Sequence, residues 1–247
     1  MNPTEQMPAA ARPLDISEKG AAREGIPQIS NRRLFIQFQA FGRCMNPGKI
    51  KDVFMSSGLE SVLYLDVNDP YGIGILSLCE DPADLTEQFR SLFHQPAFEG
   101  LTQKPELTMI GRTYSIGHEP ALEDWLLVNP RRKVLNPDYP WAVWYPLRRK
   151  AEFELLPKPE QEKIMQEHAA IGKAFGMAGY AQDVRLACQG LDTHDNDFVI
   201  GLVGPELFPL SRIVQEMRKT QQTARYLESL GPFFVGRVLW QSPIKKR

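Results

Sequence analysis

Cysteine and histidine are both scarce in this chain of 247 residues. The three cysteines, Cys44, Cys79 and Cys188, lie far apart and form no CxxC pair, and the four histidines are too scattered for a zinc site built from Cys and His. The sequence also lacks a signal-peptide pattern and any apolar run near the roughly 18 residues of a membrane span. We therefore expect a protein of the reducing cytoplasm with no membrane span.

The sequence also has no excess of basic or of acidic residues. The chain has 29 basic and 30 acidic residues, which gives a formal net charge of −1. This balance provides no general attraction to nucleic acid or to a membrane surface. With 43% hydrophobic and 24% charged residues, the composition is that of a globular protein, long enough for one large domain or two of medium size.

Residues 1–30 differ in composition from the rest of the chain. They are rich in Pro, Ala, Glu and Gln, and no apolar period is sustained among them. Such a segment cannot bury enough apolar surface to offset the entropy of ordering it. We predict a disordered tail over residues 1–30.

The remainder reads as two copies of one pattern of strands and helices. Residues 31–118 show the order strand, helix, two strands, helix, strand, at 34–41, 46–57, 61–66, 72–78, 81–93 and 107–116. Residues 140–242 repeat this order at 141–145, 159–175, 182–188, 198–203, 206–220 and 232–240. This is the ferredoxin-like order.

One numerical offset relates the two copies. Gly111-Arg112 aligns with Gly236-Arg237, and the same 125-residue shift places Ile75 on Ile200, with no gap through a strand and a helix. We predict an α+β protein of two fused ferredoxin-like repeats, the dimeric α+β barrel type. The two sheets should pack face to face, with the helices outside.

Residues 119–139 join the repeats and contain three prolines and the basic cluster Arg131, Arg132 and Lys133. Two interpretations remain open. The segment is either a solvated linker or a flap over a pocket, with its basic residues near a ligand that carries carboxylates.

His168 stands out in the second repeat. It falls on one apolar stripe of the predicted helix with Ile164, Ile171 and Phe175, at the spacing i, i+4, i+7 and i+11. A neutral imidazole in such surroundings suits an axial ligand of a haem iron. The alternative is a core histidine that is hydrogen-bonded to a backbone carbonyl.

Other polar residues gather in the same repeat. Tyr145 ends a strand and is followed by three cations, which include Arg149. Asp183 and Arg185 lie at i and i+2, on one face of a strand that we expect to be half buried, so they are candidates to line a pocket. Arg218 in the next helix is a surface charge when considered alone.

Four segments together resemble the haem-binding half of the chlorite dismutase family, which includes the coproheme decarboxylases. They are WYPLRR (144–149), MQEHAAIGKAF (165–175), GLDTHDNDF (190–198) and EMRKTQQTARYLESLGPFFVGR (216–237). The resemblance implies two fused ferredoxin-like repeats, of which only the C-terminal one binds haem. It also implies assembly into rings, often homopentamers.

The resemblance assigns roles to single residues. His168 matches the proximal iron ligand and Tyr145 the redox-active tyrosine of the decarboxylases. Arg149, Arg218 and Thr223 match groups that hold porphyrin propionates, for which cations and hydroxyls are suitable partners. Asp183 falls where dismutases carry their distal arginine, and the neighbouring Gln182 and Arg185 are alternative distal groups.

Departures from the dismutase pattern bear on the activity. An aspartate at position 183 is expected to repel chlorite. Val203 falls where dismutases have a glutamate that hydrogen-bonds the proximal imidazole, and an apolar neighbour weakens the bond from histidine to iron. Phe153-Glu154 replaces a Trp-Tyr pair of the decarboxylases.

The resemblance therefore implies a peroxide-dependent oxidative decarboxylase that converts iron-coproporphyrin III to haem b. The oxidised Tyr145 would remove a hydrogen atom from a propionate, and loss of carbon dioxide would leave a vinyl group. Two alternatives stay open. One is a haem-binding or haem-sensing protein without catalysis, and the other is a chlorite dismutase that releases oxygen.

Overall fold

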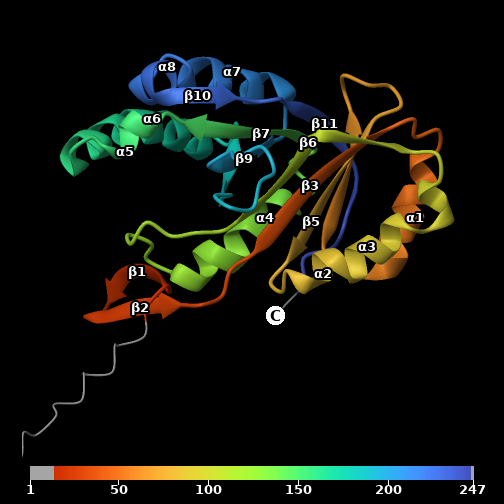
Figure 1. Ribbon diagram of the computed structural model, residues 1–247, viewed down its shortest axis with the longest axis horizontal. Coiled ribbons are helices and arrows are strands. Elements are labelled where there is room, and N and C mark those ends of the chain that lie inside the picture. Colours follow the sequence, from red (N-terminus) through yellow and green to blue (C-terminus); the bar gives the residue numbers. More distant parts are fainter. Residues whose placement is uncertain (1–13, 246–247) are drawn as a thin grey trace, which may run out of the picture.

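The computed structural model describes residues 14–245. Over this range the chain forms a nine-stranded sheet with helices on its outside, and a separate two-stranded hairpin (Figure 1). The first repeat consists of β3 (Phe35–Gly42), α1 (Pro47–Ser57), β4 (Ser61–Asp66), β5 (Ile73–Cys79), α2 (Ala83–Thr86), α3 (Gln88–Phe93), a 3₁₀ turn (Pro96–Phe98) and β6 (Thr102–Arg112). The second consists of β7 (Trp141–Arg149), α5 (Ala151–Glu154), α6 (Lys158–Met177), β8 (Gln182–Ala187), β9 (Phe198–Gly204), α7 (Leu207–Met217), α8 (Gln221–Tyr226), β10 (Leu227–Leu230) and β11 (Phe234–Gln241).

The predicted α+β fold of two ferredoxin-like repeats is confirmed. Strands β5 and β9 start and end 125 residues apart, as the sequence offset predicted. Most element ends differ from the prediction by only a few residues. Strand β7 continues four residues beyond Tyr145, because β9 and β10 both pair with this extension. The helix predicted over 81–93 is interrupted at Glu87, between α2 and α3.

The two repeats share one closed sheet. Within each repeat the strand order is ferredoxin-like, β4-β5-β3-β6 in the first and β11-β7-β9-β8 in the second. Strand β4 also pairs with β11, and β6 meets β8 at Arg112 and Ala187. The sheets therefore face each other, as predicted, and are also joined at both edges.

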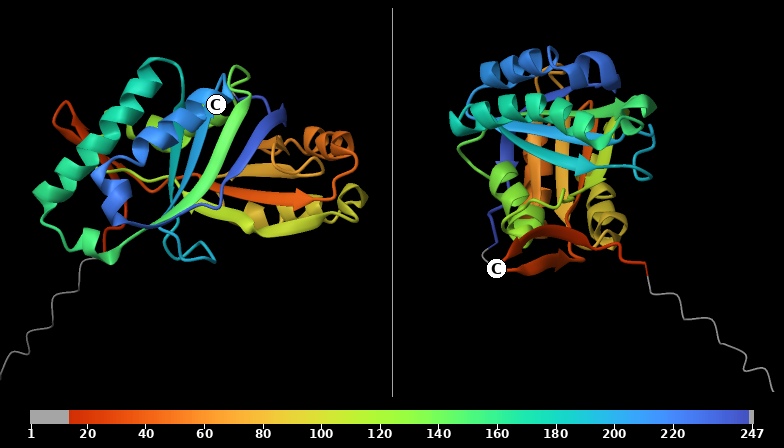
Figure 2. Two further views of the ribbon diagram at one scale, coloured as in Figure 1. Left: turned by 90° about the horizontal axis from the view of Figure 1, so that it is seen from above. Right: turned by 90° about the vertical axis from the view of Figure 1, so that its left-hand side faces the viewer.

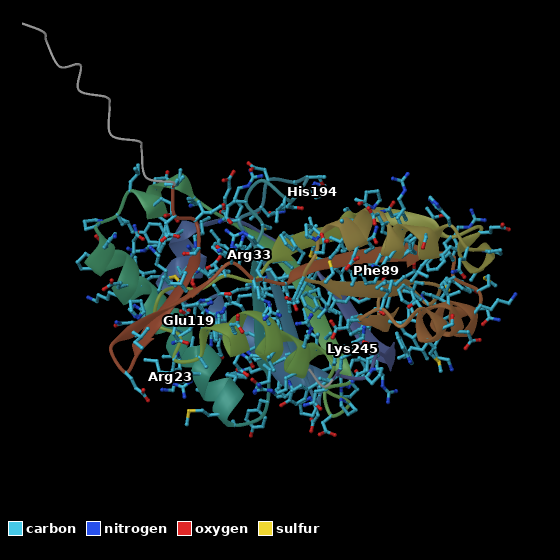
Figure 3. All side chains as sticks on the ribbon, turned by 90° about the horizontal axis from the view of Figure 1, so that it is seen from below. Arg23, Arg33, Phe89, Glu119, His194 and Lys245 are labelled. Atoms are coloured by element: carbon cyan, nitrogen blue, oxygen red, sulfur yellow. The ribbon has the colours of Figure 1, made fainter. Side chains whose placement is uncertain are left out.

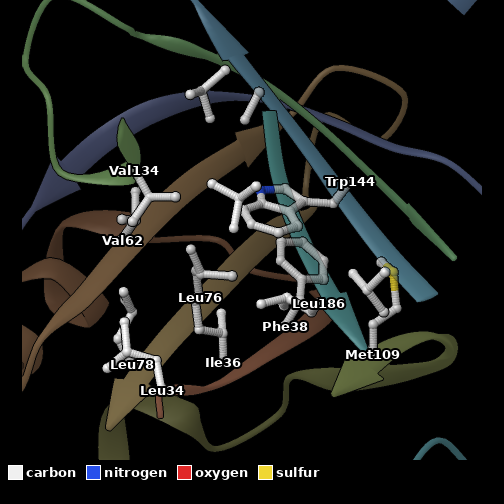
Figure 4. Packing of buried hydrophobic residues seen from close by; sticks show 14 of the residues in the cluster. Leu34, Ile36, Phe38, Val62, Leu76, Leu78, Met109, Val134, Trp144 and Leu186 are labelled. Carbon is white, nitrogen blue, oxygen red and sulfur yellow. The ribbon is translucent and has the colours of Figure 1, made fainter. Parts of the chain in front are cut away.

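Residues that alternate along the strands fill the space inside the closed sheet. Phe38 stacks on Trp144 with ring centroids 6.2 Å apart and packs against Phe234 at 4.6 Å. Figure 4 shows Phe38 and Trp144 beside Leu186 in this core. The other face of each sheet is covered by helices, α1 and α3 on the first repeat and α6 and α7 on the second (Figure 2).

Gly201 on β9 lies opposite Trp144 on β7. A Cβ at this position would overlap the indole ring, which is fully buried. We predict that Gly201→Ala destabilises the protein by about 1–3 kcal/mol, because overpacking forces a core shift. The measurement is denaturant unfolding of the apoprotein.

Gly172 on α6 is the matched control, since a Cβ there meets only Met217, at an ordinary 3.6 Å. Gly172→Ala should stabilise the protein by about 0.5–1 kcal/mol, because alanine restricts the unfolded chain more than glycine does. Equal changes in the free energy of unfolding for the two substitutions would contradict the close packing of Gly201 against Trp144.

The predicted tail requires a correction. Residues 1–13 lie outside the described residues, but Glu18–Arg23 (β1) and Ile26–Ser30 (β2) form a hairpin. Its two-residue turn, Glu24-Gly25, has positive φ at both positions, as a type I′ turn requires. The prediction failed over this stretch because polar contacts, and not an apolar face, attach the hairpin to the rest of the protein.

Two side chains make most of that attachment. The Glu18 carboxylate accepts hydrogen bonds from Arg112 at 3.0 Å and from the Ser115 amide at 2.8 Å. The Gln28 side-chain amide donates to the carbonyl of Glu119 at 3.2 Å. Figure 3 shows Glu119 beside the hairpin, at the start of the segment that joins the repeats.

The joining segment is mostly helical, with a π-helical turn (Asp124–Val128) followed by α4 (Asn129–Val134). Its three cations have different surroundings. Arg131 is buried and binds Glu60 of the first repeat at 2.9 Å, whereas Arg132 is exposed and pairs with Asp124. Lys133 points into the cavity described below.

Every helix within residues 14–245 is too short or too polar to cross a membrane.

Candidate functional site

A cavity of about 410 Å³ lies between helices α6 and α7 and the outer face of the second repeat's sheet. This volume is in the range of sites for small molecules and cofactors, about 300–1,000 Å³. The side chains singled out in the sequence all line it: Tyr145, Arg149, His168, Gln182, Asp183, Arg185, Arg218 and Thr223.

Strand alternation explains how β8 contributes to the cavity. Val184 and Leu186 point into the closed sheet and belong to its core. Asp183 and Arg185 consequently lie on the outer face of the sheet. Helix α6 covers this face, so the two side chains line the cavity and do not point into bulk solvent.

His168 projects from α6 into the cavity. Burial lowers its pKa to about 4, and the nearby cations Arg185 and Arg149 act in the same direction. The imidazole is therefore neutral at pH 7, which is the form that binds metals. Ile164 on the same stripe is buried, while Ile171 and Phe175 are half-buried.

Hydrogen bonding determines the tautomer of His168. Its Nδ1 lies 3.4 Å from Oγ1 of Thr220, whose hydroxyl donates its single hydrogen to the Met217 carbonyl at 2.8 Å. With that hydrogen directed at the carbonyl, we infer that Nδ1 carries the proton and donates to Thr220. The lone pair of Nε2 is then free, and Nε2 has no partner in the described part of the chain.

Val203 does not neighbour the imidazole, contrary to our expectation. It faces the interior of the closed sheet, whereas Ile200 and Leu202 of the same strand line the cavity. The polar partner of His168 is instead the Thr220 hydroxyl, from the junction of α7 and α8. Thr220 is also the N-cap of α8, a role that its place before Gln221-Gln222-Thr223 could have indicated.

A charged cluster forms the wall contributed by β8. The Asp183 carboxylate binds Nε of Arg185 at 3.0 Å and lies 3.6 Å from Nζ of Lys133. The same ammonium donates to the Asp183 carbonyl at 2.6 Å. Burial acts to raise the pKa of Asp183, but these two cations hold it below its ordinary value. Asp183 therefore does not present an isolated negative charge.

Arg149 is held from two sides by aromatic rings. Its guanidinium lies 4.8 Å from the centre of Phe153 and 4.7 Å from that of Phe198. Its Nη1 lies 3.7 Å from the Glu154 carboxylate, so both residues of the pair Phe153-Glu154 contact this arginine. Nε of Arg149 is buried without an acceptor among residues 14–245, which leaves a donor to be satisfied by a ligand.

Tyr145 lies on β7 and stacks on Phe233, with ring centroids 4.6 Å apart. Burial raises its pKa well above the ordinary value, so the phenol keeps its proton at neutral pH. Its ring faces the cavity from the sheet.

Several lining residues were missed in the sequence, among them Lys173, Gln222 and Tyr114. Gln222 is buried, and its side-chain oxygen has no partner in the described structure. Tyr114 comes from the first repeat and Trp125 from the joining segment, and the Trp125 indole donates to the Tyr114 carbonyl at 2.9 Å. No sequence signal indicated that Tyr114 would reach this cavity, whereas Trp125 and Lys133 belong to the segment that one of the two open interpretations placed over a pocket.

The cavity concentrates positive charge. Its lining includes five cations, Lys133, Arg149, Lys173, Arg185 and Arg218, and one carboxylate, Asp183. Five minus one leaves four excess positive charges, in a protein whose formal net charge is −1. Such a cavity attracts a ligand with several negative groups.

A sequence model of the family described as chlorite dismutase matches residues 79–239. The chain belongs to the chlorite dismutase family. Among solved structures, a haem-binding protein from Thermus thermophilus is similar, with a TM-score of 0.66 and 21% identity over 84% of this chain and 92% of that one. Chlorite dismutase from Candidatus Nitrospira defluvii, in complex with imidazole, has a TM-score of 0.62 and 16% identity over 85% and 92% of the two chains. At these identities the two structures establish a shared fold.

The residues present fit a haem-type group. A single neutral imidazole with a free Nε2 suits an axial iron ligand. No cluster of His, Cys, Asp and Glu that would hold a bare metal ion occurs among residues 14–245. The unpartnered Nε–H of Arg149 is a donor that suits a carboxylate at the rim of a porphyrin.

We predict that Thr220→Val releases the His168 tautomer. In ¹⁵N NMR spectra of the apoprotein, the wild type and Thr220→Ser should show a proton on Nδ1, whereas Thr220→Val should show a mixture of tautomers. Haem affinity should fall about tenfold or more in Thr220→Val, because partners of metal-ligating histidines are worth about 10–100-fold.

The valine also removes the N-cap of α8, so its control is Asn46→Ala, which removes the N-cap of the distant α1. This control should lower stability without altering the His168 signals. An unchanged Nδ1–H tautomer in Thr220→Val would contradict the assignment.

Proposed function

We propose that this protein binds iron-coproporphyrin III, with His168 as the iron ligand, and converts it by peroxide-dependent oxidative decarboxylation to haem b. The observation that supports this substrate is the excess of four positive charges in the cavity. Coproporphyrin III carries four propionates, whereas haem b carries two, so the substrate matches the charge of the cavity more closely. Arg149, Arg218 and Thr223 would hold propionates by charge-assisted hydrogen bonds.

The bound iron porphyrin would supply the oxidising power, with peroxide as the electron acceptor. Tyr145 would provide the redox-active phenol next to the substrate propionate. Each propionate loses carbon dioxide, two electrons and a proton, and one peroxide takes up the two electrons as it is reduced to water. The phenol remains protonated because it is buried, so it can give up and recover a hydrogen atom as a unit.

The stacking on Phe233 restricts the orientation of the Tyr145 ring. A fixed ring favours a reaction that depends on contact between the phenol oxygen and one substrate carbon. His168 would hold the iron through Nε2, and Asp183 and Arg185 would form the distal wall. We further propose assembly as a homopentamer, which light scattering of the purified protein would test.

Chlorite dismutation is the second candidate, and one observation favours it. We expected Asp183 to repel chlorite, but this carboxylate is paired with both Arg185 and Lys133. Two cations against one anion leave the distal wall attractive to a small anion. Oxygen release from chlorite by the haem-loaded protein would support this candidate.

We predict that His168→Ala abolishes five-coordinate binding of haem and of coproheme, measured by the Soret spectrum during titration of the apoprotein. His194→Ala is the control, because the His194 side chain is exposed. Its one polar contact among the described residues is a long one, 3.5 Å from Nε2 to the Pro105 carbonyl. A wild-type Soret spectrum and affinity in His168→Ala would remove the haem assignment.

We predict that Tyr145→Phe stops vinyl formation while coproheme affinity changes by at most about tenfold. A lost hydrogen bond costs about 0.5–1.5 kcal/mol, whereas the redox chemistry of the phenol has no substitute in phenylalanine. Arg218→Ala should show the opposite pattern, with weaker binding and residual turnover. Affinity is measured by titration and products by mass spectrometry after addition of peroxide.

The wild type decides between the enzyme and a binding or sensing protein. If coproheme binds but no vinyl product forms with peroxide, the haem-binding interpretation holds and decarboxylation fails. Unchanged turnover in Tyr145→Phe would eliminate the radical mechanism and leave the enzyme class intact.

A further inference from the structure

Met165 lines the cavity but takes no part in the proposed reaction. It lies on α6 three residues before His168, so the two side chains project from the same face of the helix. The side chain is half-buried, and its Sδ lies 3.5 Å from Nη2 of Arg149, which donates to it. A thioether is a weak acceptor, so this contact holds the guanidinium only loosely.

The guanidinium of Arg149 has no strong acceptor in the described part of the chain. Its Nε is buried without a partner, and its Nη1 is 3.7 Å from the Glu154 carboxylate, which is longer than a hydrogen bond. The rings of Phe153 and Phe198 hold the group from two sides and restrict its movement. A stronger acceptor formed at the Met165 sulfur would therefore meet N–H groups that are already in place.

Peroxide forms such an acceptor when it oxidises a thioether to a sulfoxide. One peroxide oxygen is transferred to the sulfur as the O–O bond breaks, and the sulfur loses two electrons. The other oxygen leaves as water with both hydrogens, so the step needs no further co-reactant. The product carries a strongly polar S–O group where the thioether had a lone pair.

We propose that Met165 is a peroxide-sensitive modification site that regulates ligand binding through Arg149. In the thioether form, the N–H groups of Arg149 remain available to an anionic ligand. In the sulfoxide form, the new oxygen accepts a charge-assisted hydrogen bond from Nη2 and occupies a donor that a carboxylate would use. The cavity then binds a carboxylate-bearing ligand more weakly until the sulfoxide is reduced again.

This inference deepens the proposed function and rests on it, because the proposed reaction brings peroxide to the cavity. An excess of peroxide over substrate would then lower the affinity of the empty site. The contact between the sulfoxide and Arg149 involves protein atoms alone. It is therefore tested in the apoprotein, where failure of the porphyrin assignment does not affect the result.

The apoprotein test follows the Nε–H signal of Arg149 in ¹H–¹⁵N NMR spectra, assigned by its absence in Arg149→Lys. Peroxide treatment should shift this signal in the wild type, in step with the Met165 sulfoxide measured by peptide mass spectrometry. In Met165→Leu, which has no sulfur at this position, peroxide should leave the signal unchanged. Met177→Leu is the matched control, because Met177 lines the same cavity and is 79% exposed, and its signal should shift as in the wild type.

The effect on binding is measured by titration with iron-coproporphyrin III after the peroxide has been removed, and is expressed as a ratio to the untreated form of each variant. Affinity should fall roughly tenfold in the wild type and in Met177→Leu, the factor that corresponds to the loss of about one hydrogen bond. It should stay constant in Met165→Leu, which conserves the side-chain volume, and in Met165→Ile, a second variant without sulfur.

Met165→Gln places a carbonyl oxygen near the position of the sulfoxide oxygen and does not react with peroxide. The Arg149 signal of this variant should be displaced before any treatment, and its coproheme affinity should not respond to peroxide.

An equal loss of affinity in peroxide-treated wild type and Met165→Leu would overturn the proposal, because another residue would then respond to peroxide. A Met165 that stays unoxidised while Met177 is fully converted would overturn it as well, and so would a Met165 sulfoxide that leaves the Arg149 signal unmoved. If the sulfoxide moves that signal but coproheme binds to neither form, the modification site stands and the porphyrin assignment fails.

Discussion

The alternation of side chains along β7, β8 and β9 is the constraint on which the site depends. On one face of these strands, Trp144, Val184 and Val203 pack into the closed sheet. Residues in between are forced to the opposite face, where Tyr145 and Asp183 meet the cavity. A shift of one residue in β8 would exchange its two faces and place Asp183 and Arg185 in the core. Fold and site are therefore specified by the same pattern.

The cavity also concentrates positive charge in a chain without a large net charge, as the polyanionic ligand proposed above requires. Among the acidic residues that the structure describes, only Asp183 lines the cavity, and the others lie elsewhere. Burial makes the cations of the lining more effective, because their field is less screened there than in water. The same burial keeps His168 neutral and Tyr145 protonated, and these are the forms that their proposed roles as iron ligand and hydrogen-atom donor require.

Much of this arrangement could be predicted from the sequence, because it is local or periodic. The 125-residue offset identified the repeats, and the i, i+2 spacing placed Asp183 and Arg185 on one face. The contacts that could not be predicted join distant parts of the chain. The pairing of Asp183 with Lys133 spans 50 residues and reverses the sign expected for the distal wall. Likewise, the bond between His168 and Thr220 depends on how α7 and α8 meet, which no periodicity encodes.

The hairpin shows a different limit of sequence reasoning. Composition indicated disorder because β1 and β2 have no apolar face to bury. Glu18 and Gln28 instead make long-range hydrogen bonds to residues 112–119, and such contacts leave no mark on hydrophobic periodicity. The attachment brings the start of the described chain against the beginning of the joining segment that carries Lys133.

Comparison of the two repeats explains why the second contains this cavity. In the first, the space between sheet and helices is filled by large rings, among them Phe54, Phe89 and Phe98. In the second, α6 presents Ala169, Gly172 and Gly176 to the same kind of space. Small residues on that face leave unfilled volume, and each glycine within a helix costs about 0.5–1 kcal/mol relative to alanine. A protein selected for stability alone would fill this interface as the first repeat does, and the unfilled volume in the second repeat is what the proposed ligand requires.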